Sequence, residues 1–117
     1  MVNNRKQVHP NKIAITWVLG CSIIAVFGAV FLGFIHTLPP VNLYTHGTLI
    51  TAMHGHLAFW GAYACLVLAV IAYTLPIMTG KPIYNSRLFV YSFWASNIGM
   101  TLMVFSFACA GITQVFL

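Results

Sequence analysis

Residues 45–78 read THGTLITAMHGHLAFWGAYACLVLAVIAYTLPIM and contain no Asp, Glu, Lys or Arg. About 20 predominantly apolar residues are enough for a helix to cross the hydrocarbon layer of a bilayer. The stretch therefore predicts a membrane-spanning helix over about 45–78. Pro76 falls in its last turn, where the proline ring would kink or end the helix.

A second uncharged run precedes this stretch, over residues 13–35. It predicts a spanning helix over about 11–37, which ends before Pro39 and Pro40 because a residue that precedes proline disfavours the α-helical region. A short uncharged loop, from 38 to about 44, is expected to join the two helices.

A third apolar run predicts a helix over about 85–117, with Asn85 or Ser86 as its N-cap. The predicted fold class is therefore all-α integral membrane, with three transmembrane helices in one membrane domain over residues 1–117. The three helices are expected to be surrounded by the lipid bilayer and by other helices.

The composition supports this fold and excludes several functions. Of the 117 residues, 61% are hydrophobic and 4% are charged, whereas about 25% of a soluble domain is charged. Without Asp or Glu, the chain cannot form a carboxylate acid/base pair or an oxygen-ligand metal site. The basic residues do not form a clustered face, so nucleic acid is not an expected partner.

The positive charges predict an orientation. They precede the first helix or lie between the second and third helices, and they are Arg5, Lys6, Lys12, Lys81 and Arg87. Since cytoplasmic loops carry an excess of Lys and Arg, the N-terminus is expected in the cytoplasm and the 38–44 loop outside. The cysteines, Cys21, Cys65 and Cys109, lack metal-site spacing and are expected to be small buried residues.

The histidines of the middle helix are the candidate functional residues. His54 lies roughly 13 Å below the outer helix end at 1.5 Å per residue, where an imidazole needs a partner. His54 and His56 differ by about 200° around a helix, so they point to opposite sides and cannot clamp one ion. Each can instead bind a separate haem iron, or form a hydrogen bond to a neighbouring helix.

Two further histidines lie near the outer ends of the first and second helices. His36 and His46 are expected in capping or interface roles, within reach of water or headgroups. If haems are present, their propionates should point toward this outer surface. The candidate propionate partners are His36, Asn42, Tyr44 and His46.

The stretch GFIHTLPPVNLYTHGTLITAMHGHLAFWGAY, continuing through LPIMTG, resembles the large catalytic subunit of bacterial nitric oxide reductases of the cytochrome c-dependent type, within the haem–copper oxidase superfamily. The resemblance extends from about Asn11 to the final AGITQVFL. It implies that His54 is the proximal ligand of the high-spin haem b3 and His56 an axial ligand of the low-spin haem b.

The resemblance also implies the reaction and the partners. Two NO molecules, two electrons and two protons give N2O and water, in a multi-pass protein of the bacterial inner membrane. The expected partners are nitric oxide, a cytochrome c-type small subunit and the remaining helices of the same subunit. The other haem ligand, the non-haem iron ligands and the catalytic glutamates of the family have no counterpart here, so the chain is interpreted as a fragment that is inactive alone.

Three alternatives remain open from the sequence. A cbb-type oxygen reductase shares the back-to-back histidines. A small haem-binding membrane anchor would transfer electrons without catalysing a reaction. A structural membrane module would use its histidines only for hydrogen bonds between helices.

Overall fold

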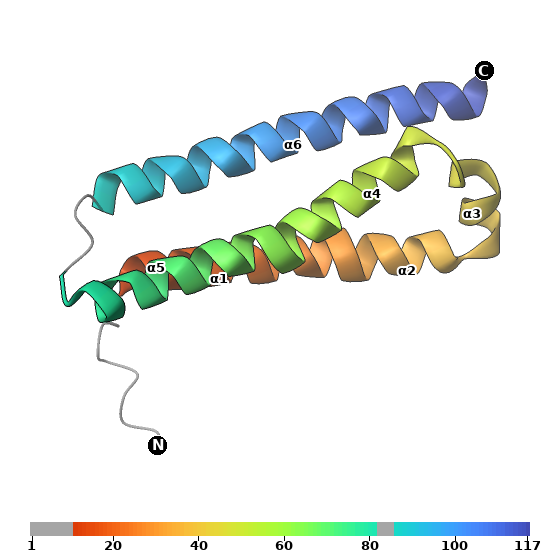
Figure 1. Ribbon diagram of the computed structural model, residues 1–117. Coiled ribbons are helices and arrows are strands. Elements are labelled where there is room, and N and C mark those ends of the chain that lie inside the picture. Colours follow the sequence, from red (N-terminus) through yellow and green to blue (C-terminus); the bar gives the residue numbers. More distant parts are fainter. Residues whose placement is uncertain (1–10, 82–85) are drawn as a thin grey trace.

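The computed structural model describes residues 11–81 and 86–117, which form three long helical spans, the first two joined by a short helix (Figure 1). The first span comprises α1 (Lys12–Ala25), η2 (Val26–Phe31) and α2 (Leu32–Thr37), and the short helix α3 (Pro39–Thr45) follows it. The second span comprises α4 (Leu49–Phe59), η3 (Trp60–Ala64) and α5 (Cys65–Thr79). The third span is the single helix α6 (Ser86–Phe116).

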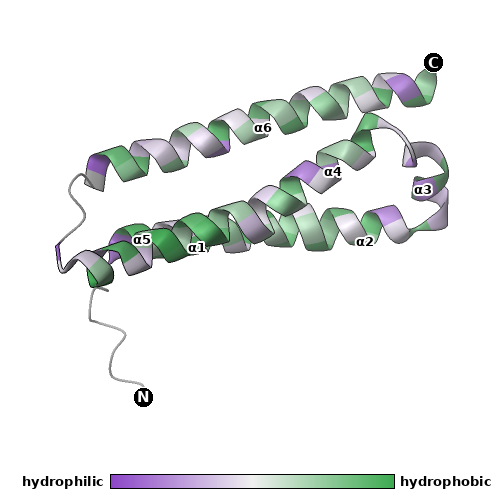
Figure 2. Ribbon diagram, viewed as in Figure 1, coloured by the Kyte–Doolittle hydropathy of each residue, from purple (hydrophilic) through white to green (hydrophobic). Residues whose placement is uncertain are grey.

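All three spans are long and apolar enough to cross a bilayer. The first covers 26 residues and the second 31, which exceeds the roughly 20 residues required. Hydrophobic residues are spread along each span, and hydrophilic ones lie near the ends, around the turn at α3 and at a few positions within α4 and α6 (Figure 2). The predicted fold class, an all-α membrane protein with three spanning helices, is confirmed.

The expected loop over 38–44 is wrong, because Pro39–Thr45 forms the helix α3. Leu38 is extended and the two prolines take the first helical positions. An N–H at these positions would have no partner within the helix, so its absence from proline costs no hydrogen bond. The second span consequently begins at Leu49 rather than at about 45. Gly47, with a φ of 77°, separates the two helices, and the side chain of Thr48 caps the second by accepting a hydrogen bond from the Ile50 N–H.

Individual residues also explain where the spans begin and stop near the basic residues. The Asn11 side chain accepts a hydrogen bond from the Ala14 N–H and caps the first span. Pro76 does not end the second span, which continues to Thr79 and stops at Gly80 in the left-handed conformation. The expected N-cap Asn85 lies outside the described residues.

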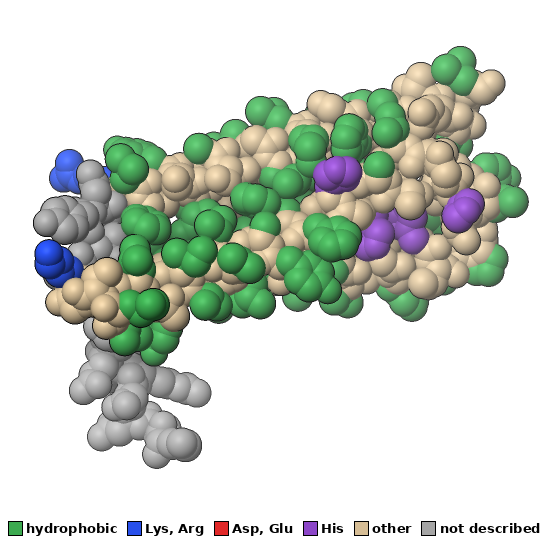
Figure 3. Space-filling model, in the orientation of Figure 1, with side chains coloured by type: hydrophobic (Ala, Val, Ile, Leu, Met, Phe, Trp, Pro, Cys, Tyr) green, Lys and Arg blue, Asp and Glu red, His purple; other side chains and the backbone are tan. Residues whose placement is uncertain are grey.

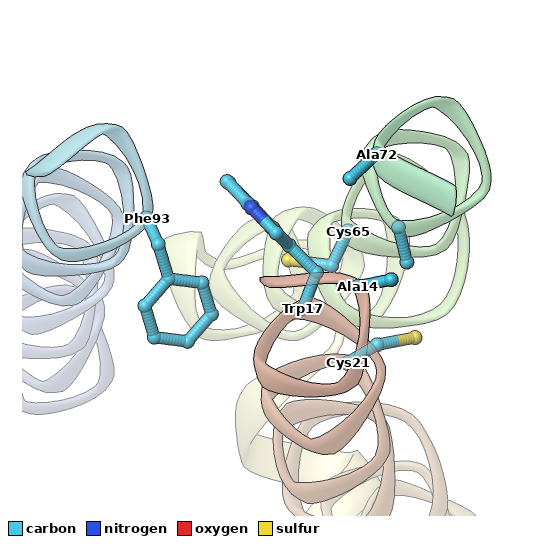
Figure 4. Close-up of a cluster of buried hydrophobic side chains, with 7 residues drawn as sticks. Ala14, Trp17, Cys21, Cys65, Ala72 and Phe93 are labelled. Carbon is cyan, nitrogen blue, oxygen red and sulfur yellow. The ribbon is translucent and has the colours of Figure 1, made fainter. Parts of the chain in front are cut away.

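The core lies between the three spans, toward the end that carries Lys12 and Lys81. It contains Trp17 and small residues of α1 and α5, with Phe93 reaching in from α6 (Figure 4). The Trp17 and Phe93 rings meet edge to face, with centroids 4.9 Å apart. A Cβ on Gly20 would lie 2.5 Å from the Phe93 ring, so this glycine leaves the space that the ring occupies.

The cysteine prediction is partly wrong. Cys21 and Cys65 are buried in this core, whereas Cys109 is exposed on α6. The difference arises because α6 contacts the rest of the chain along a narrow strip, and the outer side of the helix faces no other part of the described chain. Hydrogen bonds also join α6 to the middle span: the Trp60 ring N–H donates to the Asn97 side-chain oxygen and the Leu49 N–H to the Gln114 side-chain oxygen, both at 2.9 Å.

The first two spans each contain a π-helical turn, and the turn of the second span is hydrogen-bonded to α1 of the first. In η3, the Gly61 carbonyl accepts a hydrogen bond from the Cys21 thiol at 2.7 Å. A Cβ on Gly61 would lie 2.7 Å from the backbone nitrogen of Ala25. A π turn disrupts the regular pattern of helix hydrogen bonds and frequently marks a functional site. Glycine at this crossing lets the backbones approach closely enough for the thiol to reach the carbonyl.

Candidate functional site

In the part of the chain that the structure describes, the histidines gather toward the end opposite the Lys and Arg side chains (Figure 3). His54 projects from α4 toward the first span. Its Nδ1 lies 2.7 Å from the carbonyl oxygen of Gly28, within η2. A carbonyl oxygen only accepts, so Nδ1 carries the proton and donates to it. Nε2 is the ring nitrogen that this hydrogen bond leaves available to a ligand.

Two residues of α2 complete the surroundings of the His54 ring. Gly33 lies beside it, and a Cβ built there would be 3.7 Å from Nε2 and 3.4 Å from the adjacent ring carbon. The His36 ring is stacked on the His54 ring, with centroids 5.2 Å apart and planes 22° from parallel. The ring of His54 therefore touches η2 and α2, and its Nε2 remains clear of side chains at Gly33.

His56 projects from the other flank of the same helix. Its Nδ1 lies 2.8 Å from the Ala52 carbonyl, one turn earlier, and so carries the proton. Its ring meets the Phe107 ring of α6 edge to face at 5.4 Å. The two histidines therefore face different spans, the first and the third, as their i, i+2 spacing predicts.

An apolar groove of about 1000 Å³ opens beside His56. Its walls come almost entirely from the middle span, with a single contribution from α6, and include Ala52, Gly55, His56, Phe59, Trp60, Tyr63 and Met100. A Cβ on Gly55 would meet no atom within 4 Å, so space is open at this position. The volume is in the range of protein sites for organic ligands, which are mostly apolar with a few polar groups.

The two imidazoles fit axial haem ligation. A metal-bound histidine almost always donates its other ring N–H to a carbonyl, carboxylate or water, which fixes the tautomer and orients the ring. His54 and His56 both do so at Nδ1, and no protein hydrogen bond is formed by Nε2 of either ring to the described residues. The tautomers of both imidazoles therefore fit axial ligation, and the groove beside His56 provides space for a flat organic group on that flank. Within residues 11–81 and 86–117, no three His, Cys, Asp or Glu side chains gather as a metal site.

The structure places the four candidate propionate partners in two groups. His36 turns inward to His54, with its Nδ1 donating to the Leu32 carbonyl at 2.7 Å, rather than reaching water or headgroups as expected. Asn42 and Tyr44 are exposed on α3, and His46 is exposed directly after it. All four lie at the end of the molecule opposite Lys12 and Lys81.

Several features of the site were not predicted from the sequence, among them the Gly28 carbonyl, the space at Gly33, the stacked His36 ring and the Phe107 ring. The Gly28 carbonyl that binds the His54 side chain lies in the π turn of η2, and a π turn has no residue signature in this sequence. Gly33 and His36 are three residues apart and so share a helix face, which is a signal that connects them.

The chain belongs to the family described as "Cytochrome C and Quinol oxidase polypeptide I", which it matches over residues 1–117. Among curated proteins, it is similar to a nitric oxide reductase subunit of Stutzerimonas stutzeri, with 44% identity over 121 aligned residues that cover all of this chain. The chain spans about a quarter of that relative, 26% of its length. Together with the three spanning helices, the family identifies a multi-pass membrane protein.

Proposed function

We propose that this chain is part of the catalytic subunit of a nitric oxide reductase, in which 2 NO, two electrons and two protons give N2O and water. The observation that carries the proposal is the pair of imidazoles on opposite flanks of α4, each with Nδ1–H bound to a carbonyl and Nε2 free of described hydrogen-bond partners. The 44% identity to the Stutzerimonas stutzeri nitric oxide reductase chain favours NO as substrate over oxygen.

His54 is proposed as the proximal ligand of the high-spin haem b3 and His56 as an axial ligand of the low-spin haem b. A bound haem would supply an iron that accepts electrons or binds NO. The chain's own residues would hold and orient it: Gly28 fixes the His54 tautomer, Ala52 fixes that of His56, and the groove beside His56 offers an apolar wall. His36, Asn42, Tyr44 and His46 are proposed as partners for propionates at the outer end.

The rest of the site is proposed to come from outside this segment. A non-haem iron, the second ligand of the low-spin haem and the groups that deliver protons would be supplied by the remaining helices of the subunit. A cytochrome c-type subunit is the proposed electron donor. The proposed location is the bacterial inner membrane with the N-terminus in the cytoplasm, because the basic residues precede or begin the first span, or lie between the second and third spans and at the start of the third.

The test is a pair of substitutions in the membrane complex that contains this chain, read by visible and electron paramagnetic resonance spectra. We expect His54→Ala to remove the high-spin haem signal and NO reduction. We expect His56→Ala to remove the low-spin signal first. Thr74→Ala is the matched control on the same span, because the Thr74 hydroxyl bonds back to the Val70 carbonyl of its own helix.

Exchange of the two spectroscopic outcomes would overturn the ligand assignment. Activity separates the remaining functions. Oxygen consumption without NO consumption would identify an oxygen reductase, which the matched family also includes. A bis-histidine low-spin haem on this chain by itself would favour the electron-transfer anchor, because His54 and His56 face different spans and cannot share one iron.

A further inference from the structure

The ring of His36 lies against the ring of His54, and axial ligation by His54 does not by itself require this contact. The centroids are 5.2 Å apart and the planes are 22° from parallel, so the rings are stacked face to face. His36 belongs to α2, the last helical segment of the first span, which ends at Thr37. The contact therefore joins the outer end of the first span to the middle of α4.

The His36 ring is itself held in place. Its Nδ1 donates to the Leu32 carbonyl at 2.7 Å, one turn back in the same helix. Its Nε2 is buried and makes no hydrogen bond to any described residue. Since Nδ1 is bonded to the Leu32 carbonyl and Nε2 has no partner among the described residues, neither nitrogen bonds to His54, and the interaction that His36 offers this residue is the flat face of the imidazole.

A hydrogen bond from Nδ1 does not fully fix an imidazole plane. The bond from His54 to Gly28 sets the direction of the N–H, but the torsion that turns a histidine ring is broad. A second ring stacked on one face restricts that rotation. Gly33, one turn before His36, has no side chain and leaves the edge of the ring that carries Nε2 uncrowded.

We propose that His36 is a positioning residue, whose stacked ring fixes the plane of the His54 imidazole and so the orientation of that imidazole on the high-spin haem. The proposal rests on the proposed function in one respect, that His54 binds iron. His36 does not touch the iron in this scheme. It acts only through His54.

The test compares His36→Phe, which keeps a flat ring, with His36→Leu, which removes it. The measurement is the iron–histidine stretching band of the reduced high-spin haem in the membrane complex, recorded by resonance Raman. We expect the Phe variant to keep a single band at the native frequency. We expect the Leu variant to give a shifted or broadened band, while the amount of bound haem stays close to the native amount.

Controls separate positioning from general damage. Phe34→Leu changes an exposed residue of the same helix and should leave the band unaltered. The low-spin haem proposed on His56 is an internal control for folding in each sample. If His36→Leu loses both haems, His36→Met replaces it as the variant without a flat ring and must show the altered band.

Two results would overturn the positioning role: an unaltered band in the variant without a ring, or an equal shift in the Phe and Leu variants. His54→Ala makes this failure distinguishable from failure of the proposed function. If that substitution removes the high-spin haem while the ring-free His36 variant keeps the native band, His54 is a ligand and His36 does not position it. If His54→Ala leaves the haem in place, the ligand assignment itself is wrong.

Discussion

At the scale of single residues, backbone carbonyls determine which ring nitrogen of the two central histidines is left free. Gly28 and Ala52 each accept an Nδ1–H, so both rings are held as the tautomer with a free Nε2 lone pair. In a helix interior, a carbonyl normally accepts from the helix itself. The His56 ring shares such a carbonyl within its own helix, whereas His54 reaches across to one in a π turn. Both imidazoles thus donate from Nδ1, but His54 donates to the first span and His56 to its own helix.

Gly33 provides a prediction at this scale. Its absent side chain leaves the space beside Nε2 of His54, where a Cβ would be 3.7 Å away. An alanine makes ordinary contact there, so we expect Gly33→Ala to retain most of the high-spin haem. The methyl groups of Gly33→Val extend further and would crowd the proposed iron-binding nitrogen, because metal–imidazole bonds are only about 2 Å long. We expect that variant to lose most of this haem, measured from the visible spectrum of the purified complex.

The matched control for the valine substitution is Gly99→Val. A Cβ at position 99 on α6 would meet no atom within 4 Å, so the control introduces the same helix-disfavouring side chain without the crowding. Equal haem loss in the two valine variants would show that the effect comes from helix propensity, and not from the space beside His54.

At the scale of helices, the first two spans are locked together by reciprocal contacts at their π turns. The His54 side chain of the middle span bonds to Gly28 in η2, and the Cys21 side chain of the first span bonds to Gly61 in η3. Both glycines lie where the backbones are close: a Cβ on Gly28 would be 3.1 Å from the backbone carbonyl carbon of Leu57. The position of the proposed haem ligand is consequently coupled to how tightly these two spans pack.

We expect Gly61→Ala to weaken this packing. Its Cβ would lie 2.7 Å from the Ala25 backbone nitrogen and 2.8 Å from the Ile24 side chain, so one helix must move. Overpacking of this kind typically costs about 1–3 kcal/mol. The measurement is the free energy of unfolding of the chain in mixed micelles as denaturing detergent increases.

Gly99→Ala is the control for this measurement, since the added methyl group meets open space. Alanine favours helix over glycine by about 0.8–1.0 kcal/mol, so this variant should be unchanged or slightly more stable. A Gly61→Ala chain as stable as the Gly99→Ala chain would contradict the close crossing of the two spans.

The elements show which features the sequence predicts and which it does not. Long uncharged runs predict the three spans, because a helix satisfies its own backbone where water is absent. The helix of Pro39–Thr45 is missed, since a proline pair ends one helix and also starts the next. The opposite directions of His54 and His56 follow from helix geometry. The stacking of His36 on His54 does not, because it depends on how two spans cross.

At the scale of the whole molecule, most of the apolar surface is not covered by the chain itself. Within an apolar stretch of 18 residues from each span, the share of residues buried inside the molecule is 11% in the first span, 22% in the second and 6% in the third. Lipid and further helices must cover the rest, since exposed apolar surface of this extent is unfavourable in water. This agrees with a chain that spans 26% of the length of its curated relative. The proposed haem groove is likewise walled mainly by one span and opens outward.

The distribution of charge along the molecule gives the last prediction, its orientation. The described Lys and Arg side chains lie at one end, at Lys12, Lys81 and Arg87, and α3 at the other end carries none (Figure 3). Since basic residues are retained in the cytoplasm, we expect α3 to face the outside.

Leu43→Cys, at a position that is 76% exposed on α3, should react with a membrane-impermeant maleimide on intact cells. Met78→Cys, at a position 83% exposed at the basic end, should react only after lysis. The unsubstituted chain is the background control, because its three cysteines lie within the spans. Labelling of Met78→Cys but not Leu43→Cys on intact cells would reverse the orientation, and with it the side from which the proposed propionate partners are reached.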